Sequence, residues 1–384
     1  MNRSSYYKVG RIPFDSKVEA CIFSQKVNKP IEWVYDAKEV FDKYDWSVEP
    51  LFSLDYYYDK RAREIREKYD YVAITYSGGA DSHNMLLSFI RQDLLVDEIL
   101  VAHISELSDK RAQALGDSSD PTNIVAEHRL NVIPKLRDLR GKLPNTKFTV
   151  VDMSDRVLDF VSTKREEDWI YDYKDVSPIW NVTRDWFHIP EFKNTLDSGK
   201  RVALVMGSEK PRMAIVDGSV YTMFTDTALL MGTPDSFKHQ YTNVVAEYFY
   251  WDKTTVDMLC KQAHEIKRQL ELNPSLQRLW DKNLLGDSYN DVYRTYHERM
   301  MIPWIYTTWD NGFQAVKSKG GTWTSEYDSL WWKDSVDSKQ VEIFNRGLKY
   351  LEEQANHLIL YKDGVPQRLR TFMIQYKIGS IAQR

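Results

Sequence analysis

Short apolar runs alternate with helical apolar spacing through the first two thirds of the sequence. The clearest run, residues 69–76, reads Tyr-Asp-Tyr-Val-Ala-Ile-Thr-Tyr, which is typical of a buried parallel strand, and it stops at two glycines. Further strands are predicted at residues 98–104, 147–152 and 202–206, and helices at residues 81–90 and 123–139. Strands that alternate with helices predict an α/β fold with a mainly parallel sheet and flanking helices, which binds ligands at the carboxyl ends of its strands.

The two ends of the chain have other patterns. Residues 1–54 mix short apolar alternations with turn residues, which predicts a small strand-containing segment. The charged run at residues 59–68 predicts an exposed helix with acid–base pairs at helical spacing. Residues 213–225 predict a hairpin that turns at Asp217-Gly218.

After about residue 240 the pattern becomes mostly helical, with the best helices at residues 255–272 and 339–360. A Trp-rich and Gly-rich stretch lies between them. We therefore expect three parts, namely a short N-terminal segment, an α/β domain and a mainly helical part that contacts a substrate. Their predicted bounds are residues 1–54, 55–240 and 241–384.

The composition is that of a soluble globular protein of enzyme size, because 42% of the 384 residues are hydrophobic and 28% are charged. A net charge of −4 argues against a strongly basic surface that coats nucleic acid, although it leaves a local basic groove open. The N-terminus lacks the apolar core of a signal peptide, and no stretch is apolar enough for a transmembrane helix. We expect a cytoplasmic protein that does not associate with a membrane.

Cysteine and histidine usage argues against a metal site built from protein ligands alone. Cys21 and Cys260 are far apart, so there is no disulfide framework, no CxxC and no zinc or iron–sulfur cluster. The pair His297-Glu298 fails as a metalloprotease motif because Met301 stands where the second histidine should be.

A glycine-rich hexapeptide follows the first predicted strand of the α/β domain. It reads Ser77-Gly78-Gly79-Ala80-Asp81-Ser82, and a predicted helix comes directly after it. At such a place backbone N–H groups and the positive end of the helix dipole converge on an anion, and glycines let the backbone approach a phosphate closely. The serine hydroxyls can donate further hydrogen bonds, and Asp81 can hold Mg²⁺ between phosphate oxygens. The sequence therefore predicts a phosphate-binding loop.

The hexapeptide is not a Walker A loop, which needs Gly-Lys followed by Ser or Thr; the nearest candidates, Gly141-Lys142-Leu143 and Gly199-Lys200-Arg201, both fail that pattern. It resembles the SGGxDS signature of the PP-loop ATP pyrophosphatase superfamily, which includes the synthetase domains of asparagine synthetase and GMP synthetase. The resemblance covers roughly residues 55–230 and implies an adenine nucleotide alpha hydrolase-like (HUP-type) fold, with ATP and Mg²⁺ as cofactors. The chain length and the Trp- and Tyr-rich tail are similar to PP-loop proteins encoded by bacteriophages.

A second motif follows the fourth predicted strand, Gly207-Ser208-Glu209-Lys210-Pro211-Arg212, and should lie on the same carboxyl-end edge of the sheet. In the family a basic residue after a later strand closes over the β- and γ-phosphates. The resemblance assigns this catalytic role to Lys210, beside Asp81, with Arg212 as a helper. By the same analogy Tyr76 and His103, at the ends of two strands, lie near the adenine or ribose. The alternative for Lys210 and Arg212 is that they are solvated charges in a surface turn.

Three further carboxylates lie near predicted strand ends or loops, where one could bind magnesium or position a nucleophile. They are Glu106, Glu127 and Asp226. The alternative for each of them is a solvated acid.

Members of the family activate a carbonyl or carboxylate oxygen with AMP, release pyrophosphate, and let a nucleophile displace the AMP. Asn2 stands where glutamine-dependent members often carry a cysteine, and the chain lacks the paired or C-terminal cysteines of sulfur-transferring members. We therefore expect an ATP-dependent amide- or amidine-forming ligase that uses ammonia or an amine. Two alternatives stay open, a sulfurtransferase or sulfonucleotide reductase-like enzyme supplied with sulfur by a partner, and a nucleotide-binding module without chemistry.

The acceptor stays open between a small acid and a nucleobase or nucleic acid, as does assembly into a homo-oligomer. Basic and aromatic residues in the tail have the composition of a surface that stacks on nucleobases, although tryptophans are more often core or interface residues. These residues are Trp304, Trp309, Lys317, Lys319, Trp323, Trp331 and Trp332.

Overall fold

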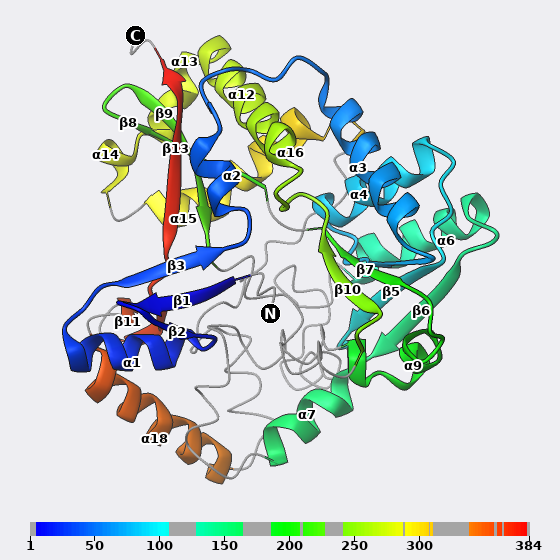
Figure 1. Cartoon of the computed structure of the whole chain (residues 1–384), viewed down its shortest axis with the longest axis horizontal. Helices are drawn as coiled ribbons and strands as arrows, with labels where there is room; N and C mark the ends of the chain where they lie inside the picture. The colour runs from blue at the N-terminus through cyan, green and yellow to red at the C-terminus, as the bar shows by residue number, and fades with distance from the viewer. Residues whose placement is uncertain are drawn as a thin grey trace.

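A five-stranded parallel sheet is the scaffold of the protein (Figure 1). The computed structural model describes residues 5–106, 128–163, 186–207, 210–226, 241–286, 289–306, 308–309, 338–356, 359–362 and 365–381. The strand order is β10-β7-β4-β5-β6, and all four pairings are parallel. The strands are β4 (Tyr71–Thr75), β5 (Glu98–His103), β6 (Lys147–Asp152), β7 (Val202–Met206) and β10 (Val244–Tyr248). The predicted α/β fold with a mainly parallel sheet is confirmed.

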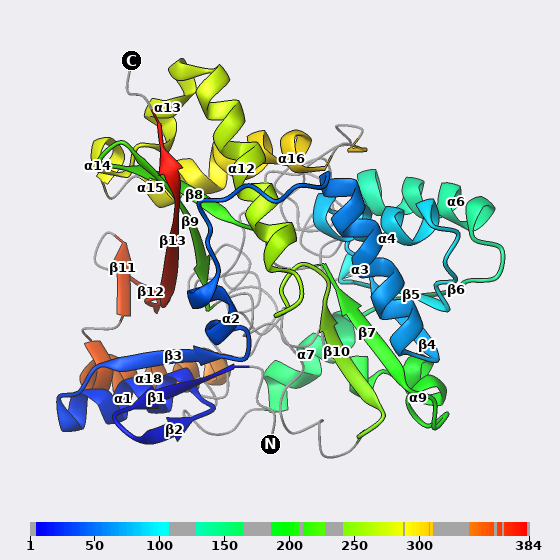
Figure 2. The same ribbon diagram turned by 45° about the horizontal axis from the view of Figure 1, so that its top comes forward.

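Alternate residues of the strands face two layers of helices, because successive side chains of a strand point to opposite faces. Val72 and Ile74 pack in one core cluster, whereas Ala73 between them packs in another. Figure 2 shows the first layer above the sheet and the second below it. The first layer contains α3 (Leu54–Lys68), α4 (Ala80–Arg91) and α6 (Ile133–Lys142), and the second contains α7 (Ser154–Thr163) and α9 (Pro190–Leu196).

The charged run at 59–68 forms the predicted helix, but one of its faces is buried. Helix α3 begins after Ser53, whose side chain accepts a hydrogen bond from the Tyr56 amide. Tyr58, Ala62 and Arg61 are buried along it. The expectation of an exposed helix was therefore right about the helix and wrong about this face, since the partner of Arg61 lies almost 190 residues later in the sequence.

The segment before α3 is strand-containing, as predicted. It forms a three-stranded sheet of order β2-β1-β3, with two helices. Trp33 and Phe41 pack their rings against Trp251, so the segment shares a core with the residues that follow β10. The elements are β1 (Ser5–Val9), β2 (Ile12–Phe14), α1 (Lys17–Val27), β3 (Ile31–Tyr35) and α2 (Lys38–Lys43).

The predicted hairpin is present and turns where expected. Strands β8 (Arg212–Val216) and β9 (Ser219–Thr225) pair antiparallel, and Asp217 and Gly218 both have positive φ, as a two-residue hairpin turn requires. Strand β13 (Met373–Ser380), near the C-terminus, adds to the free side of β9, so this sheet has the order β13-β9-β8 (Figure 1).

The C-terminal part is mainly helical, as expected. No helix in the described part of the chain is long and apolar enough to cross a membrane. The helices are α12 (Val256–Leu272), α13 (Pro274–Trp280), α14 (Lys282–Leu285), α15 (Tyr289–Val292), α16 (Glu298–Ile305) and α18 (Ser338–Ala355), with a π-helical turn at Tyr293–His297 and a short hairpin of β11 (Ile359–Lys362) and β12 (Val365–Leu369).

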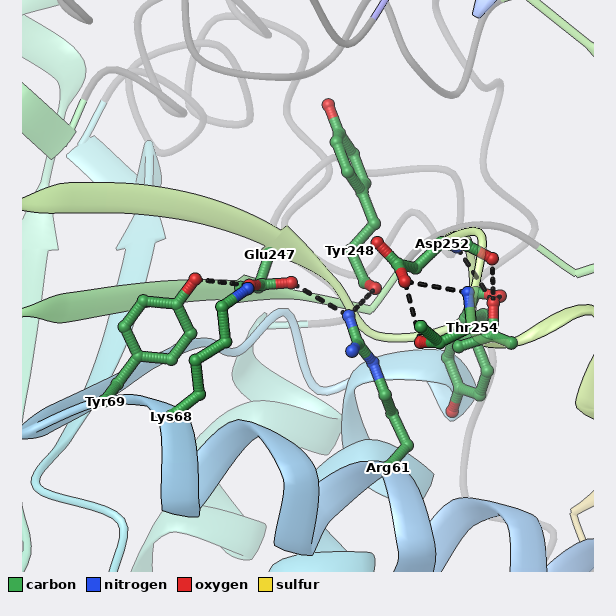
Figure 3. A network of polar contacts seen from close by, with 9 residues as sticks. Arg61, Lys68, Tyr69, Glu247, Tyr248, Asp252 and Thr254 are labelled. Atoms are coloured by element: carbon green, nitrogen blue, oxygen red, sulfur yellow. Dashed lines mark hydrogen bonds and ion pairs between the residues drawn. The ribbon is translucent and has the colours of Figure 1, made fainter. Parts of the chain in front are cut away.

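Strand β10 was not predicted, and a buried ion pair anchors it. Glu247 on β10 accepts hydrogen bonds from Arg61 (2.9 Å), from Lys68 (2.7 Å) and from the Tyr69 hydroxyl. Figure 3 shows these three donors converging on the carboxylate from α3 and the residue after it. Arg61 also donates to the carbonyl of Tyr248 at 3.0 Å. The network fixes the edge strand on α3, directly before the residues that reach the candidate site.

We predict that Glu247→Ala lowers the free energy of unfolding by about 3–5 kcal/mol at pH 7, because it leaves the buried Arg61 guanidinium without its counter-charge. Chemical denaturation measures this. Asp70→Ala, which breaks the exposed ion pair with Arg201, is the control and should leave the unfolding midpoint nearly unchanged. Equal shifts for the two variants would contradict the anchoring role.

The same ion pair should show in the pH dependence of stability. Burial alone would raise the pKa of Glu247, but the charge of Arg61 and the hydrogen bonds from Lys68 and Tyr69 outweigh it and lower that pKa. The ionised Glu247 therefore adds to the free energy of unfolding above the ordinary glutamate pKa, and this contribution is lost as the pH falls through the lowered pKa. Glu247→Ala should lose this part of the acid dependence.

Candidate functional site

The glycine loop connects the carboxyl end of β4 to the first turn of α4, as predicted. Its two serines hold it together. The Ser77 amide donates to the Ser82 hydroxyl oxygen at 3.2 Å, and the Ser82 hydroxyl donates to the Gly79 carbonyl at 3.2 Å. Gly79 is the N-cap of α4, so the amides of the first turn have no carbonyl partner within the helix. They lie at the positive end of the helix dipole, which favours an anion.

Two glycines allow backbone segments to meet at this loop. Gly78 has a φ of +72°, and a Cβ there would lie 2.5 Å from a methyl carbon of Val132. Gly207, after β7, lies so close to α4 that its Cβ would be 3.0 Å from the Ser82 nitrogen. The carbonyl of Gly78 accepts hydrogen bonds from Asn131 (3.2 Å) and from Lys135 (3.4 Å). A side chain at Gly78 would therefore clash with the Val132 side chain, and one at Gly207 would clash with the backbone of Ser82.

Asp81 and Lys210 form an ion pair across the loop. The Lys210 ammonium lies 3.0 Å from Oδ1 and 2.8 Å from Oδ2 of Asp81. The Asp81 side chain is 31% exposed, and that of Lys210 is 13% exposed, so the pair is accessible without being fully solvated. The two motifs that the sequence singled out are thus brought together. Ser208 and Glu209, between β7 and Lys210, lie outside the described residues.

Buried tyrosines from the C-terminal part complete the surroundings of Asp81. The Tyr306 hydroxyl donates to Asp81 Oδ1 at 2.6 Å, and the Tyr250 hydroxyl donates to the Asp81 backbone carbonyl at 2.9 Å. Asn84 donates to the Tyr250 oxygen at 3.0 Å. Burial first, and the charge of Asp81 second, raise the pKa of both phenols well above the ordinary tyrosine value. Both therefore stay protonated and act as donors. Sequence reasoning missed them.

Tyr76 and His103 lie at the ends of adjacent strands, as expected. The buried Tyr76 hydroxyl is 2.9 Å from Nδ1 of His83 on α4. The His103 ring stacks on His128 at 4.1 Å between centroids, and its Nδ1 lies 3.4 Å from an Asp152 oxygen. Burial lowers the pKa of both histidines, for His128 to about 4 with a smaller effect from His103. Both rings are therefore neutral at pH 7.

The remaining predicted residues have different surroundings. Arg212 is the first residue of β8, with its guanidinium 5.1 Å from the Tyr293 ring centre. The Glu106 amide donates to Asp152 at 3.1 Å, at the ends of β5 and β6. Glu127 lies outside the described residues.

Asp226 is neither a solvated acid nor free to bind a ligand, contrary to both interpretations of it. It is fully buried, in an ion pair with Lys17 at 3.1 Å. The Tyr7 hydroxyl (2.8 Å) and the Phe372 amide (3.1 Å) also donate to its carboxylate. Asp226 therefore joins the N-terminal segment to the chain just before β13.

Of the two described tail tryptophans proposed to stack on bases, Trp309 lies beside the glycine loop, whereas Trp304 packs against another tryptophan. The Lys135 ammonium is 4.2 Å from the Trp309 ring centre, and the His83 ring is 6.0 Å from it. Trp304 packs against Trp280. The other tail residues proposed to stack on bases, Lys317, Lys319, Trp323, Trp331 and Trp332, lie outside the described residues.

A magnesium ion would have to rest on Asp81 together with ligand oxygens. No group of three or more His, Cys, Asp or Glu within the described ranges could hold a metal ion. Magnesium in nucleotide sites keeps several waters and takes one or two carboxylates plus substrate phosphates. The partly exposed carboxylate of Asp81, in the first turn of α4 beside backbone amides that can bind a phosphate, fits that requirement.

Comparison with models of known protein families finds no match, and a search of curated proteins finds none either. The fold and the contacts described above therefore carry the functional argument.

We predict that Gly78→Ala destabilises the protein by about 1–3 kcal/mol, because the residue keeps a positive φ and its Cβ meets Val132. Thermal or chemical unfolding measures this. Adding Val132→Ala should recover the steric part only. Gly141→Ala on α6, where a Cβ meets nothing within 4 Å, is the control and should be neutral or stabilising. A neutral Gly78→Ala would contradict the described loop geometry.

Proposed function

We propose that this chain binds ATP at the Ser77–Ser82 loop and breaks it between the α- and β-phosphates, so that AMP is transferred to a carbonyl or carboxylate acceptor and pyrophosphate leaves. The observation that carries the proposal is the meeting of Asp81 and Lys210, which belong to motifs 129 residues apart in the sequence. Asp81 belongs to the hexapeptide that resembles the PP-loop signature, and Lys210 is the basic residue expected after a later strand. Their contact supports the resemblance because it joins the two motifs in space.

The residues of the loop suit the β- and γ-phosphates. The first-turn amides of α4 and the backbone at Gly78 would supply donors, and the helix dipole adds positive potential. Lys210 is close enough to Asp81 to exchange that carboxylate for a phosphate oxygen by rotating its flexible side chain. Its charge would then stabilise the negative charge that accumulates on departing pyrophosphate. Asp81 would hold magnesium, which neutralises the leaving group when bound.

The cysteines favour ammonia or an amine over sulfur as the nucleophile. Both thiols are buried, and burial raises the pKa of Cys260 to about 12. Its thiol lies 3.6 Å from the carbonyls of Trp46 and Val48. A thiolate carrier needs a lowered pKa and access to solvent, and neither is found at Cys260. A sulfurtransferase would therefore need sulfur from a partner, which keeps it as the second choice.

The AMP-forming reaction is tested by product analysis. With ATP, ammonium and an extract of metabolites or nucleic acid, we predict AMP and pyrophosphate in equal amounts, only when the extract is present. Lys210→Ala should slow their formation by about 100-fold, because a cation over the leaving group contributes most in the transition state. Lys200→Ala, an exposed lysine just before β7, is the matched control and should retain activity.

Mass spectrometry and nucleotide chromatography give the measurement. ADP and orthophosphate as the main products would overturn the proposal. Product formation with sulfide but not with ammonium would replace the ligase by the sulfurtransferase.

A further inference from the structure

A buried tyrosine from the C-terminal part reaches the carboxylate of the glycine loop. Tyr306 directly follows α16 and lies 225 residues after Asp81 in the sequence, yet its hydroxyl donates to Asp81 Oδ1 at 2.6 Å. The Tyr306 side chain is almost fully buried, with 1% of its residue surface exposed. A buried hydroxyl needs a hydrogen-bond partner, and the Tyr306 hydroxyl finds one in the partly exposed Asp81 carboxylate.

The two carboxylate oxygens of Asp81 accept different sets of hydrogen bonds. Oδ1 accepts from Lys210 at 3.0 Å and from Tyr306 at 2.6 Å, whereas Oδ2 accepts from Lys210 at 2.8 Å. If Lys210 moves to a phosphate, Tyr306 still holds Oδ1. The Oδ2 atom is then free to bind a metal ion, while the Tyr306 hydrogen bond still restrains Oδ1.

The C-terminal part holds the loop at other points as well. Tyr250 donates to the Asp81 backbone carbonyl at 2.9 Å, and its ring packs against that of Tyr306 with centroids 5.8 Å apart. The Lys135 ammonium makes a cation–π contact with the Trp309 ring and donates a hydrogen bond to the Gly78 carbonyl. Asp81 therefore contacts residues that follow β10 directly, whereas Gly78 is linked to Trp309 only through Lys135.

We propose that Tyr306 is a positioning residue for Asp81, which orients the carboxylate for a magnesium ion carried in with ATP. This inference rests on the proposed function. It links the carboxylate that would hold the metal ion to the C-terminal part of the chain. Tyr306 touches no substrate in this scheme, and it acts through the orientation of Asp81.

Tyr58 provides a matched control for Tyr306. It is fully buried in the same cluster, with its ring 6.0 Å from the Tyr306 ring. Its hydroxyl donates to the Ile305 carbonyl at 2.9 Å and accepts from Gln262 at 2.9 Å. Tyr58→Phe and Tyr306→Phe thus each delete one buried hydroxyl, but only the second hydroxyl bonds to the Asp81 carboxylate.

The experiment measures ATP binding by calorimetry with Mg²⁺ and with EDTA, for the wild type and both variants. We expect Tyr306→Phe to reduce the Mg²⁺ enhancement of ATP affinity by about tenfold, the lower end of the scale for one hydrogen bond to a charged group. Binding of metal-free ATP should change less than about twofold, since Asp81 then has no metal to hold. Tyr58→Phe should leave both affinities within about twofold, because its hydroxyl bonds to the Ile305 carbonyl and not to the Asp81 carboxylate.

A double-mutant cycle with Asp81→Asn separates positioning from damage to the fold. In the Asp81→Asn background, Tyr306→Phe should cause no further loss of Mg²⁺ enhancement. Equal effects of Tyr306→Phe on ATP binding with and without Mg²⁺, or no effect on either, would overturn the positioning role while leaving the proposed function intact. A wild-type protein that binds no ATP under either condition would overturn the proposed function, and this inference with it.

Discussion

The candidate site depends on the close approach of β7 to the first turn of α4. Thr75 and Met206 are paired in the parallel register of β4 and β7, so the two chain segments leave the sheet side by side at its carboxyl edge. Gly207 lets the backbone after β7 lie against Ser82, where a Cβ would be only 3.0 Å from the backbone nitrogen. Lys210 can reach Asp81 because of this contact.

Buried ion pairs away from the glycine loop also hold these segments in place. Glu247 secures β10 to α3, and the chain then continues to Tyr250, which bonds to the backbone of Asp81. Asp226 joins the N-terminal segment to the residues before β13 through its ion pair with Lys17. Buried ion pairs cost desolvation energy, so their value here lies in fixing which segments meet. The sheet, the N-terminal segment and the C-terminal part consequently share one core cluster.

The sequence predicted those elements whose structure depends on residues close together in the chain. The run before Ser77, the glycines after it and the apolar face of α4 together predict strand, turn and helix, and Asp217-Gly218 predicts its hairpin turn. Strand β10 was not predicted because it carries the charged Glu247, and the residues of α3 that balance this charge are remote in sequence. The link between Tyr306 and Asp81 escaped for the same reason, since no spacing rule connects residues so far apart. Asp226 was misinterpreted because nothing near it in the sequence shows that Lys17 is its partner.

In the proposed mechanism the Lys210–Asp81 ion pair gives way to a phosphate of ATP. A crystal structure with Mg²⁺ and α,β-methylene ATP, which cannot be cleaved at the proposed bond, tests this without knowledge of the acceptor. We expect the β- and γ-phosphates at the first turn of α4, with the Lys210 ammonium on a phosphate oxygen and no longer on Asp81. Phosphates bound elsewhere, or an unchanged Lys210–Asp81 pair beside bound nucleotide, would contradict it.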